Sequence, residues 1–350
     1  MGIELPSERT VLGVGIHGAG QVAAEYAAAI GANPHVRLAA VTSRRRASAE
    51  RLAARFAPTA TVHDRYEDLL ADPGVDIVSL SVPNYLHARD AILALRAGKH
   101  VILEKPPAIA WDELHELVEA AREATTKSVV SFVLRWHPMI ANLKAMLDSG
   151  AIGDVYYAEA DYWHGIKPSF SSYEWIRRKE FAGGAMITGG CHAADMVRYL
   201  SGLEVAEVSA YSHRARGDFD YPTTLVAAVR FDGGAVGKLS ASLDGLAYPY
   251  QFNIDLLGTD GAIRDNRVYS RGLFPEQTDW VTLPSATPNS GAVHHHPFQR
   301  VIDNLVDCIL DGTPVLSDIL DGARSIAVAL AIEESAATGE SVAVPELWRR

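Results

Sequence analysis

The 350-residue chain is 48% hydrophobic and 21% charged, as expected of a globular protein, and its length favours two domains. Its 32 Lys and Arg residues against 43 Asp and Glu residues give a net charge of −11, which argues against a general nucleic-acid binder. Two cysteines support no disulfide framework, and no apolar run reaches the roughly 18 residues of a membrane span. The polar first ten residues contain no signal-peptide core, so a cytoplasmic protein is expected.

Short apolar runs alternate with amphipathic segments in the first part of the chain. The runs predict strands at Thr10–Ile16, Val36–Thr42, Val75–Val82, His100–Leu103 and Val129–Leu134. The amphipathic segments predict helices at Gln21–Ile30, Ala47–Phe56, Ala88–Ala97 and Trp111–Ala124. Because this alternation builds right-handed βαβ units, residues 1–130 are predicted to form an α/β domain with a doubly wound parallel sheet.

Strands joined by tight turns replace this pattern after about residue 150. The predicted strands are Val155–Trp163, Thr223–Phe231, Ala235–Leu243 and Gln251–Leu257. Residues 265–295 are predicted to be a loop. One closing helix is expected from Phe298, and another over Asp318–Thr338, capped by Ser317 and stopped at Gly339. Residues 131–350 are therefore predicted to form an α+β domain with an antiparallel sheet.

Two overlapping glycine patterns follow the first strand. Gly13-x-Gly15-x-x-Gly18 matches the dinucleotide fingerprint literally, whereas Gly18-Ala19-Gly20 matches a relaxed form. The second register is favoured because an apolar strand precedes it and a helix, beginning with Gln21 and Val22, follows it. Gly18 would then make the tight turn, and Gly20 would admit a pyrophosphate at the helix N-terminus. A purely structural glycine turn is the alternative.

The end of the second strand, where a dinucleotide's ribose is recognised, contains Ser43, Arg44, Arg45 and Arg46. An NAD enzyme usually has a carboxylate there, while arginine and serine can bind a 2′-phosphate. The sequence therefore favours NADP over NAD. An exposed basic start to the second helix is the alternative.

Several motifs together resemble one known family. They are Pro83-Asn84-Tyr85-Leu86-His87, Glu104-Lys105-Pro106, Arg135-Trp136-His137-Pro138 and Gly189-Gly190-Cys191-His192. The chain resembles Gfo/Idh/MocA oxidoreductases, such as glucose–fructose oxidoreductase and inositol dehydrogenase, over nearly its whole length. This resemblance implies a Rossmann domain followed by a domain with a large open, mostly antiparallel sheet, through which relatives form oligomers. It also implies a homodimer or homotetramer, a sugar or cyclitol substrate, and cofactor contacts from Pro83, Asn84, His87, Glu104 and Lys105.

Oxidation of a secondary alcohol needs a base near the hydroxyl that loses its proton. Lys105 follows an apolar strand and lies where a nicotinamide ring is expected, so it is the first candidate. His192 is the second, and Asp195, three residues on, shares its helix face and could orient the ring. An ion pair of Lys105 with Glu104 and a core role for His192 are the alternatives.

One position departs from the family. Relatives often have Asp four residues before this histidine, whereas this chain has Thr188, which cannot take up a proton at neutral pH. Either Lys105 and His192 then suffice, with Lys105 carrying more of the proton chemistry, or proton transfer passes through His192 and water. A loss of redox activity is the third alternative. Further candidates for substrate binding have side chains suited to stacking or hydrogen bonding; they are Arg135, His137, Trp163, His164, Arg177 and Thr188 itself.

A metal site is not predicted. His294, His295 and His296 are adjacent, so they cannot all point one way, and no Cys or acidic residue has ligand spacing. Three functions compete: a dehydrogenase for a ring hydroxyl, a redox-neutral glycosidase or epimerase that retains its nicotinamide, and a non-enzymatic cofactor sensor. Retention of both Lys105 and His192 favours an enzyme.

Overall fold

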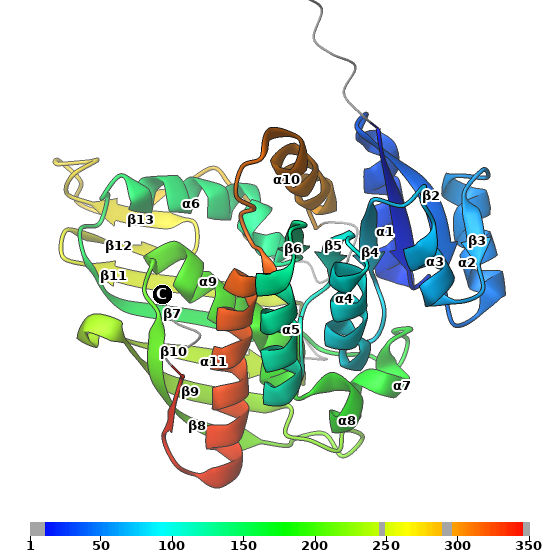
Figure 1. The fold of residues 1–350 in the computed structure, drawn as a ribbon. Coiled ribbons are helices and arrows are strands. Elements are labelled where there is room, and N and C mark those ends of the chain that lie inside the picture. Colours follow the sequence, from blue (N-terminus) through cyan, green and yellow to red (C-terminus); the bar gives the residue numbers. More distant parts are fainter. Residues whose placement is uncertain (1–10, 245–248, 289–295, 346–350) are drawn as a thin grey trace, which may run out of the picture.

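The structure is a computed structural model that describes residues 11–244, 249–288 and 296–345. Figure 1 shows two sheets with helices packed between and around them. The first sheet is parallel throughout and has the order β3-β2-β1-β4-β5-β6. Its strands are β1 (Leu12–His17), β2 (Val36–Thr42), β3 (Thr61–His63), β4 (Ile77–Leu80), β5 (His100–Leu103) and β6 (Ser128–Val130). The strand order reverses between β1 and β4, which is where doubly wound sheets bind ligands.

Helices cover both faces of this sheet, which is why its strands are apolar nearly throughout. One face packs on α1 (Gln21–Ala32), α2 (Arg46–Phe56) and α10 (Phe298–Asp311). The other packs on α3 (Tyr66–Ala71), α4 (His87–Arg96) and α5 (Trp111–Glu123). The ring of Tyr26 in α1 lies edge-on to Phe298 at 5.0 Å, so α10 joins the first layer although it is distant in sequence.

The second sheet has the order β14-β13-β12-β11-β7-β10-β9-β8-β15. Its strands are β7 (Val155–Trp163), β8 (Val205–His213), β9 (Thr224–Phe231), β10 (Val236–Ser242), β11 (Gln251–Gly258), β12 (Gly261–Arg264), β13 (Arg267–Ser270), β14 (Val281–Thr282) and β15 (Val342–Ala343). β7 and β10 pair in parallel, and the remaining described pairs are antiparallel.

One face of this sheet packs on α9 (Cys191–Ser201) and α11 (Ile319–Thr338), and α11 also contacts α5 (Figure 1). Residues of β9 alternate between buried and exposed, so the opposite face of the sheet points outward. η2 (Val133–Trp136) and α6 (Pro138–Asp148) lead from the first sheet to the second. η1 (Asn84–Leu86) follows β4, and α7 (Tyr173–Ile176), α8 (Lys179–Ala182) and the π-helical turn η3 (Met186–Gly190) lie between β7 and α9.

The predicted fold class is confirmed, with corrections to single elements. The apolar run Val129–Leu134 is a strand only to Val130, because Phe132 and Leu134 fill the core from a turn and from η2 instead. Residues 265–295 were predicted to be a loop, yet β13 and β14 lie within them; both strands are too short to show a period. The cap of α11 is Asp318, whose carboxylate accepts from the backbone N–H of Asp321 at 2.7 Å, and not Ser317.

Candidate functional site

The turn between β1 and α1 has the geometry of a dinucleotide site. Gly13 and Gly15 lie inside β1, and α1 begins directly after Gly20, so the structure fits the second glycine register. Gly18 has φ +101°, and a Cβ there would lie 2.3 Å from the Ser81 carbonyl oxygen. Nothing lies within 4 Å of a Cβ built on Gly20. The turn thus offers backbone and the N-terminus of α1 to an anionic group, which fits a pyrophosphate; Gln21 is exposed and Val22 half-buried beside it.

At the end of β2 the three arginines differ in their partners. Ser43 is half-buried, and Arg44 and Arg45 are exposed. Arg46 instead begins α2 and donates to Glu50 at 2.9 Å and to Asp64 at 2.6 Å. Only Ser43, Arg44 and Arg45 therefore fit the predicted contact with a ribose phosphate.

Glu104 and Lys105, adjacent at the carboxyl end of β5, have different partners. Glu104 accepts from the Tyr26 hydroxyl at 2.8 Å. Burial raises the pKa of Glu104, against the opposing effect of the Lys105 ammonium. Lys105 extends its Nζ atom to the backbone carbonyl of Thr188 at 3.1 Å. The lysine therefore reaches across to η3, immediately before the helix that bears His192.

His192 is buried in the first turn of α9, between aromatic rings. It stacks on Tyr162 at 5.6 Å and meets Phe132 edge-on at 6.0 Å. Its Nδ1 atom is buried without a hydrogen-bond partner among the described residues. Burial, and then Lys105, His296 and His164, hold the pKa of His192 well below its usual value. A neutral imidazole beside Lys105 can accept a hydrogen bond from a substrate hydroxyl.

Asp195 does not orient His192, contrary to the expectation from their helical spacing. Both its oxygens accept from Arg135, at 2.9 and 2.6 Å, and one also accepts from Ser325 at 2.9 Å. Arg135 is equally buried and pairs with Asp321 as well. Neither Asp195 nor Arg135 therefore has a group left for a substrate, and together they fix α9 to η2 and α11.

Thr188 and Asn84 are also engaged with each other. The Thr188 hydroxyl donates to the Ala182 carbonyl at 2.7 Å and accepts from the Asn84 amide at 3.1 Å. Both side chains are buried. Their polar groups connect η1 to η3, so the expected contacts of Asn84 with cofactor and of Thr188 with substrate are not supported.

His87 is likewise fully used by the protein backbone. One ring nitrogen lies 2.6 Å from the Pro106 carbonyl and the other 2.9 Å from the Val82 carbonyl. Burial lowers the pKa of His87. The ring holds the turn after β5 in place and offers no nitrogen to a cofactor; Pro83, half-buried just after β4, stays a candidate for contact.

Strand β7 points Tyr162, and not Trp163, toward His192, because successive strand residues face opposite sides of a sheet. Trp163 donates to Ser240 at 3.0 Å on the outward face, which overturns its predicted substrate role. His164, on the inward side, contacts the Tyr162 hydroxyl at 3.1 Å and the ring of Tyr250 at 5.3 Å. Tyr250 was missed by the sequence prediction, because its approach to His164 depends on contacts between residues distant in sequence.

The remaining candidates lie further out. His137 caps α6 by accepting from the backbone N–H of Met139 at 3.3 Å, and burial lowers the pKa of His137. Arg177 donates to Glu174 at 3.2 Å, while its Nε atom is buried without a described partner. These contacts do not prevent His137 or Arg177 from binding a substrate, but they give no evidence that either residue does so.

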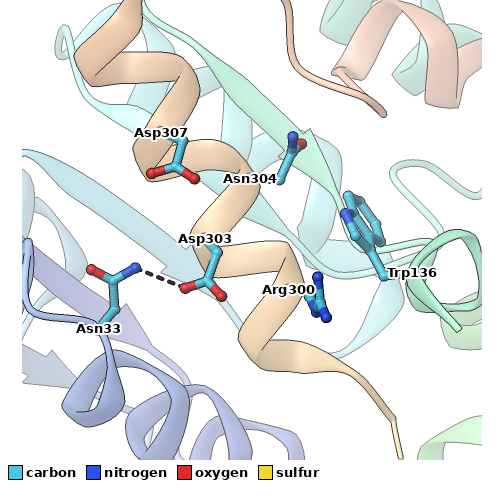
Figure 2. Close-up of a pocket in the computed structure, with 6 residues that line it drawn as sticks. All are labelled: Asn33, Trp136, Arg300, Asp303, Asn304 and Asp307. Atoms are coloured by element: carbon cyan, nitrogen blue, oxygen red, sulfur yellow. Dashed lines mark hydrogen bonds between the residues drawn. The ribbon is translucent and has the colours of Figure 1, made fainter. Parts of the chain in front are cut away.

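A pocket of about 370 Å³ lies at the far end of α1 from the glycine turn (Figure 2). It is lined by Asn33, Trp136, Arg300, Asp303, Asn304 and Asp307. The Asp303 carboxylate already accepts from Asn33 and Gln299, both at 2.8 Å. No predicted site residue lines this pocket, so it is separate from the candidate site.

Among residues 11–244, 249–288 and 296–345, no group of three or more His, Cys, Asp or Glu side chains could hold a metal ion. His294 and His295 lie outside the described residues. None of the helices in the same ranges is long and apolar enough to span a bilayer.

Comparison with known proteins agrees with this fold. A family model described as the NAD-binding Rossmann fold of an oxidoreductase family matches residues 12–132, and the same family's C-terminal alpha/beta domain matches residues 144–344. The scyllo-inositol 2-dehydrogenase (NAD(+)) of Bacillus subtilis is 28% identical over 325 residues, 88% of this chain and 89% of its own. The 1,5-anhydro-D-fructose reductase of Ensifer adhaerens is 29% identical over 290 residues, 79% of this chain and 82% of its own.

Solved structures also match nearly the whole chain. A levoglucosan dehydrogenase in complex with NADH and levoglucosan superposes with a TM-score of 0.83 and 26% identity, over 95% of this chain and 99% of its own. The two family models together cover both sheets of the structure. The chain belongs to the Gfo/Idh/MocA family of oxidoreductases.

Proposed function

We propose that the protein is an NAD(P)-dependent dehydrogenase acting on a ring hydroxyl of a sugar, glycoside or cyclitol. Residues 1–130 would bind the cofactor, and residues 131–350 would bind the substrate. The observation that carries the proposal is the contact of Lys105 with the Thr188 carbonyl at 3.1 Å, which brings the lysine to the segment that bears His192. The names of the relatives, an inositol dehydrogenase and a levoglucosan dehydrogenase among them, support this substrate class.

Lys105 and His192 have different roles in the proposed proton transfer. A bound oxidised nicotinamide supplies the hydride acceptor. Lys105 takes the proton of the substrate hydroxyl while hydride passes from the same carbon to the nicotinamide, and a ketone results. Neutral His192 accepts a hydrogen bond that orients that hydroxyl. The aromatic rings of Tyr162 and Phe132 around His192 limit water.

The preference for NADP rests on Ser43, Arg44 and Arg45 alone, since the relatives' names specify NAD(+) or NADH. We propose that the guanidinium groups of Arg44 and Arg45 pair with a 2′-phosphate. The absence of a carboxylate in 43–46 removes the usual partner of an unphosphorylated ribose.

The outward face of the second sheet is the proposed homodimer or homotetramer interface. Tyr211 of β8 lies opposite Val226 of β9, and the two are 78% and 43% exposed. Neighbouring apolar residues on an open sheet face are characteristic of association surfaces. Sedimentation of the wild type and of a Y211E variant tests this interface.

The test of the function is a screen of sugars and cyclitols with NAD and with NADP, followed by absorbance near 340 nm. Reduction of cofactor by at least one neutral or charged polyol is expected. Failure of the protein to bind either nicotinamide cofactor, measured by calorimetry, would refute the proposal. Substrate conversion without net absorbance change and with cofactor that survives dialysis would favour the redox-neutral alternative.

A further inference from the structure

The amine of Lys105, the proposed proton acceptor, is held by a backbone carbonyl of η3. Its Nζ atom donates to the Thr188 carbonyl at 3.1 Å. A carbonyl is fixed in direction by the backbone that bears it, whereas a lysine side chain has several rotatable bonds. The conformation of η3 therefore decides where the amine of Lys105 lies.

Thr188 is itself held at three of its polar groups. Its backbone N–H donates to the Gly184 carbonyl at 3.0 Å. Its hydroxyl donates to the Ala182 carbonyl at 2.7 Å and accepts from the Asn84 amide at 3.1 Å. The direction of the Thr188 carbonyl thus depends on Gly184, four residues earlier, at the entrance to η3.

A carboxyl from α11 packs against that entrance. Glu333 is 9% exposed, and its Oε1 atom accepts from the Met186 backbone N–H at 2.8 Å. The same carboxyl lies directly against Gly184, whose φ is +143° and where a Cβ would lie 2.3 Å from Oε1. A buried N–H is costly to leave without an acceptor, so this bond ties the first residue of η3 to α11.

A short series of contacts therefore joins Glu333 to Lys105. The carboxyl fixes the backbone at Gly184 and Met186. The Gly184 carbonyl accepts from the Thr188 N–H, and the Thr188 carbonyl accepts from Lys105. All the intermediate groups belong to residues 184–188. A displacement of the Glu333 carboxyl would thus be passed to the amine through a single turn of backbone.

We propose that Glu333 is a positioning residue for proton transfer: through η3, its carboxyl sets where the Lys105 amine lies relative to the substrate hydroxyl. This inference rests on the proposed dehydrogenase function and adds to it a residue that acts through other residues. The reach of the side chain is decisive, because its oxygen must meet the Met186 N–H. Burial raises the pKa of Glu333 to about 7, so an uncharged amide oxygen of equal reach is a close substitute.

The test compares E333D, which keeps the carboxyl but is one methylene shorter, with E333Q, which keeps the reach without the acid. Activity is measured on the most active compound of the polyol screen, per cofactor-binding site counted by calorimetry. We expect kcat of E333D to fall about tenfold, because a misplacement of about 1 Å near reacting groups costs up to about 100-fold. E333Q should keep the wild-type kcat, and KM should change little in both variants, since no substrate contact is removed.

Glu334 provides the matched control on the same helix. It is exposed and accepts from the Trp111 indole N–H at 3.1 Å, on the side of α5. E334D shortens this side chain by the same methylene group and should keep the wild-type kcat. A fall in E334D equal to that in E333D would overturn the inference, because shortening any carboxyl of α11 would then have the same effect.

The environment of Lys105 can also be followed without a substrate. In protein labelled with ¹³C at the lysine Cε atoms, the Lys105 signal is the one that is lost in K105R. This signal should move in E333D and stay in place in E333Q and E334D. It reports on the lysine itself, so a general loss of stability does not imitate the expected pattern.

The inference fails if E333D keeps the wild-type kcat, or if its Lys105 signal does not move. Equal impairment of E333D and E333Q also contradicts it, because the charge and not the reach would then matter. If E333D does not fold, E333Q still decides, since a lowered kcat or a displaced Lys105 signal in E333Q opposes a role that depends on reach. If no polyol is oxidised, the dehydrogenase function fails, and the Lys105 signal alone shows whether Glu333 positions this lysine.

Discussion

Arg135 and Asp195, 60 residues apart in the sequence, form a bidentate ion pair with N···O distances of 2.9 and 2.6 Å. Both side chains are almost completely buried. The pair joins η2 at the end of the first sheet to α9, the helix that begins with Cys191 and His192. A charge pair in this position fixes the relative placement of Lys105 and His192 without touching either.

Removing one partner should therefore unfold the protein more readily. We expect D195A to lower the free energy of unfolding by about 3–5 kcal/mol, because it leaves a buried guanidinium without its main counter-ion. Urea denaturation measures this loss. R122A is the matched control, since Arg122 pairs with Glu119 at 2.7 Å on the surface, and less than about 1 kcal/mol is expected there. A D195A variant as stable as R122A but inactive would assign Asp195 to catalysis instead.

Lys105 should be needed for turnover and not for stability. K105A is expected to lower kcat on the order of 100-fold or more, because the positioned proton acceptor is lost. Cofactor affinity is measured separately by fluorescence titration, so that loss of the expected contact of Lys105 with the cofactor is distinguished from loss of the proton acceptor. K127A serves as comparison, since that lysine also donates to a single backbone carbonyl. Equal activity of the two variants would show that another group takes the proton.

The arginines after β2 should differ in their effect on the preference between NADP and NAD. An R44A/R45A double variant is expected to raise the KM for NADP roughly tenfold or more while the KM for NAD changes little, because only the 2′-phosphate contact is lost. R46A should leave the ratio of the two KM values, for NADP and for NAD, unchanged, because Arg46 is already paired with Glu50 and Asp64. A wild-type enzyme that strongly prefers NAD would contradict the assignment before any variant is made.

The parts of the fold that local pattern determines could be predicted from the sequence. β2 and β5 have their predicted bounds, because apolar runs between turn residues specify buried strands. Gly18 could be identified because its turn requires a positive φ, whatever the rest of the chain does.

Side-chain partners distant in sequence could not be predicted. Helical spacing put Asp195 beside His192, but a better partner, Arg135, arrives from another element. Likewise, nothing local shows that Trp163 faces outward, because this depends on how β7 pairs with β10 and β11. The predicted substrate contact of Thr188 is not supported for the same reason, because its hydroxyl accepts from Asn84, which lies 104 residues away.

The last prediction concerns Glu333 of α11, a carboxyl buried against η3. It accepts from the Met186 backbone N–H at 2.8 Å, and Gly184 leaves the room for it, since a Cβ there would lie 2.3 Å from its Oε1 atom. Burial raises the pKa of Glu333 from 4.5 to about 7, against the opposing effects of Met186 and Lys179. The folded protein therefore holds this proton more tightly than the unfolded chain.

The sign of the pH dependence follows from that difference. The contribution of Glu333 to stability is complete below about pH 4.5 and is lost as pH rises through about 7, a change on the order of 3 kcal/mol. E333Q keeps an oxygen for the Met186 N–H but cannot ionise, so its free energy of unfolding should not fall through this window. Urea denaturation of both proteins between pH 5 and 8 measures the difference, with E340Q, an exposed site, as control. Parallel curves for wild type and E333Q would mean that Glu333 ionises at an ordinary pH. If the unfolding free energy of the wild type instead falls below that of E333Q as pH rises, η3, which precedes His192, is held by a carboxyl that loses its proton near neutrality.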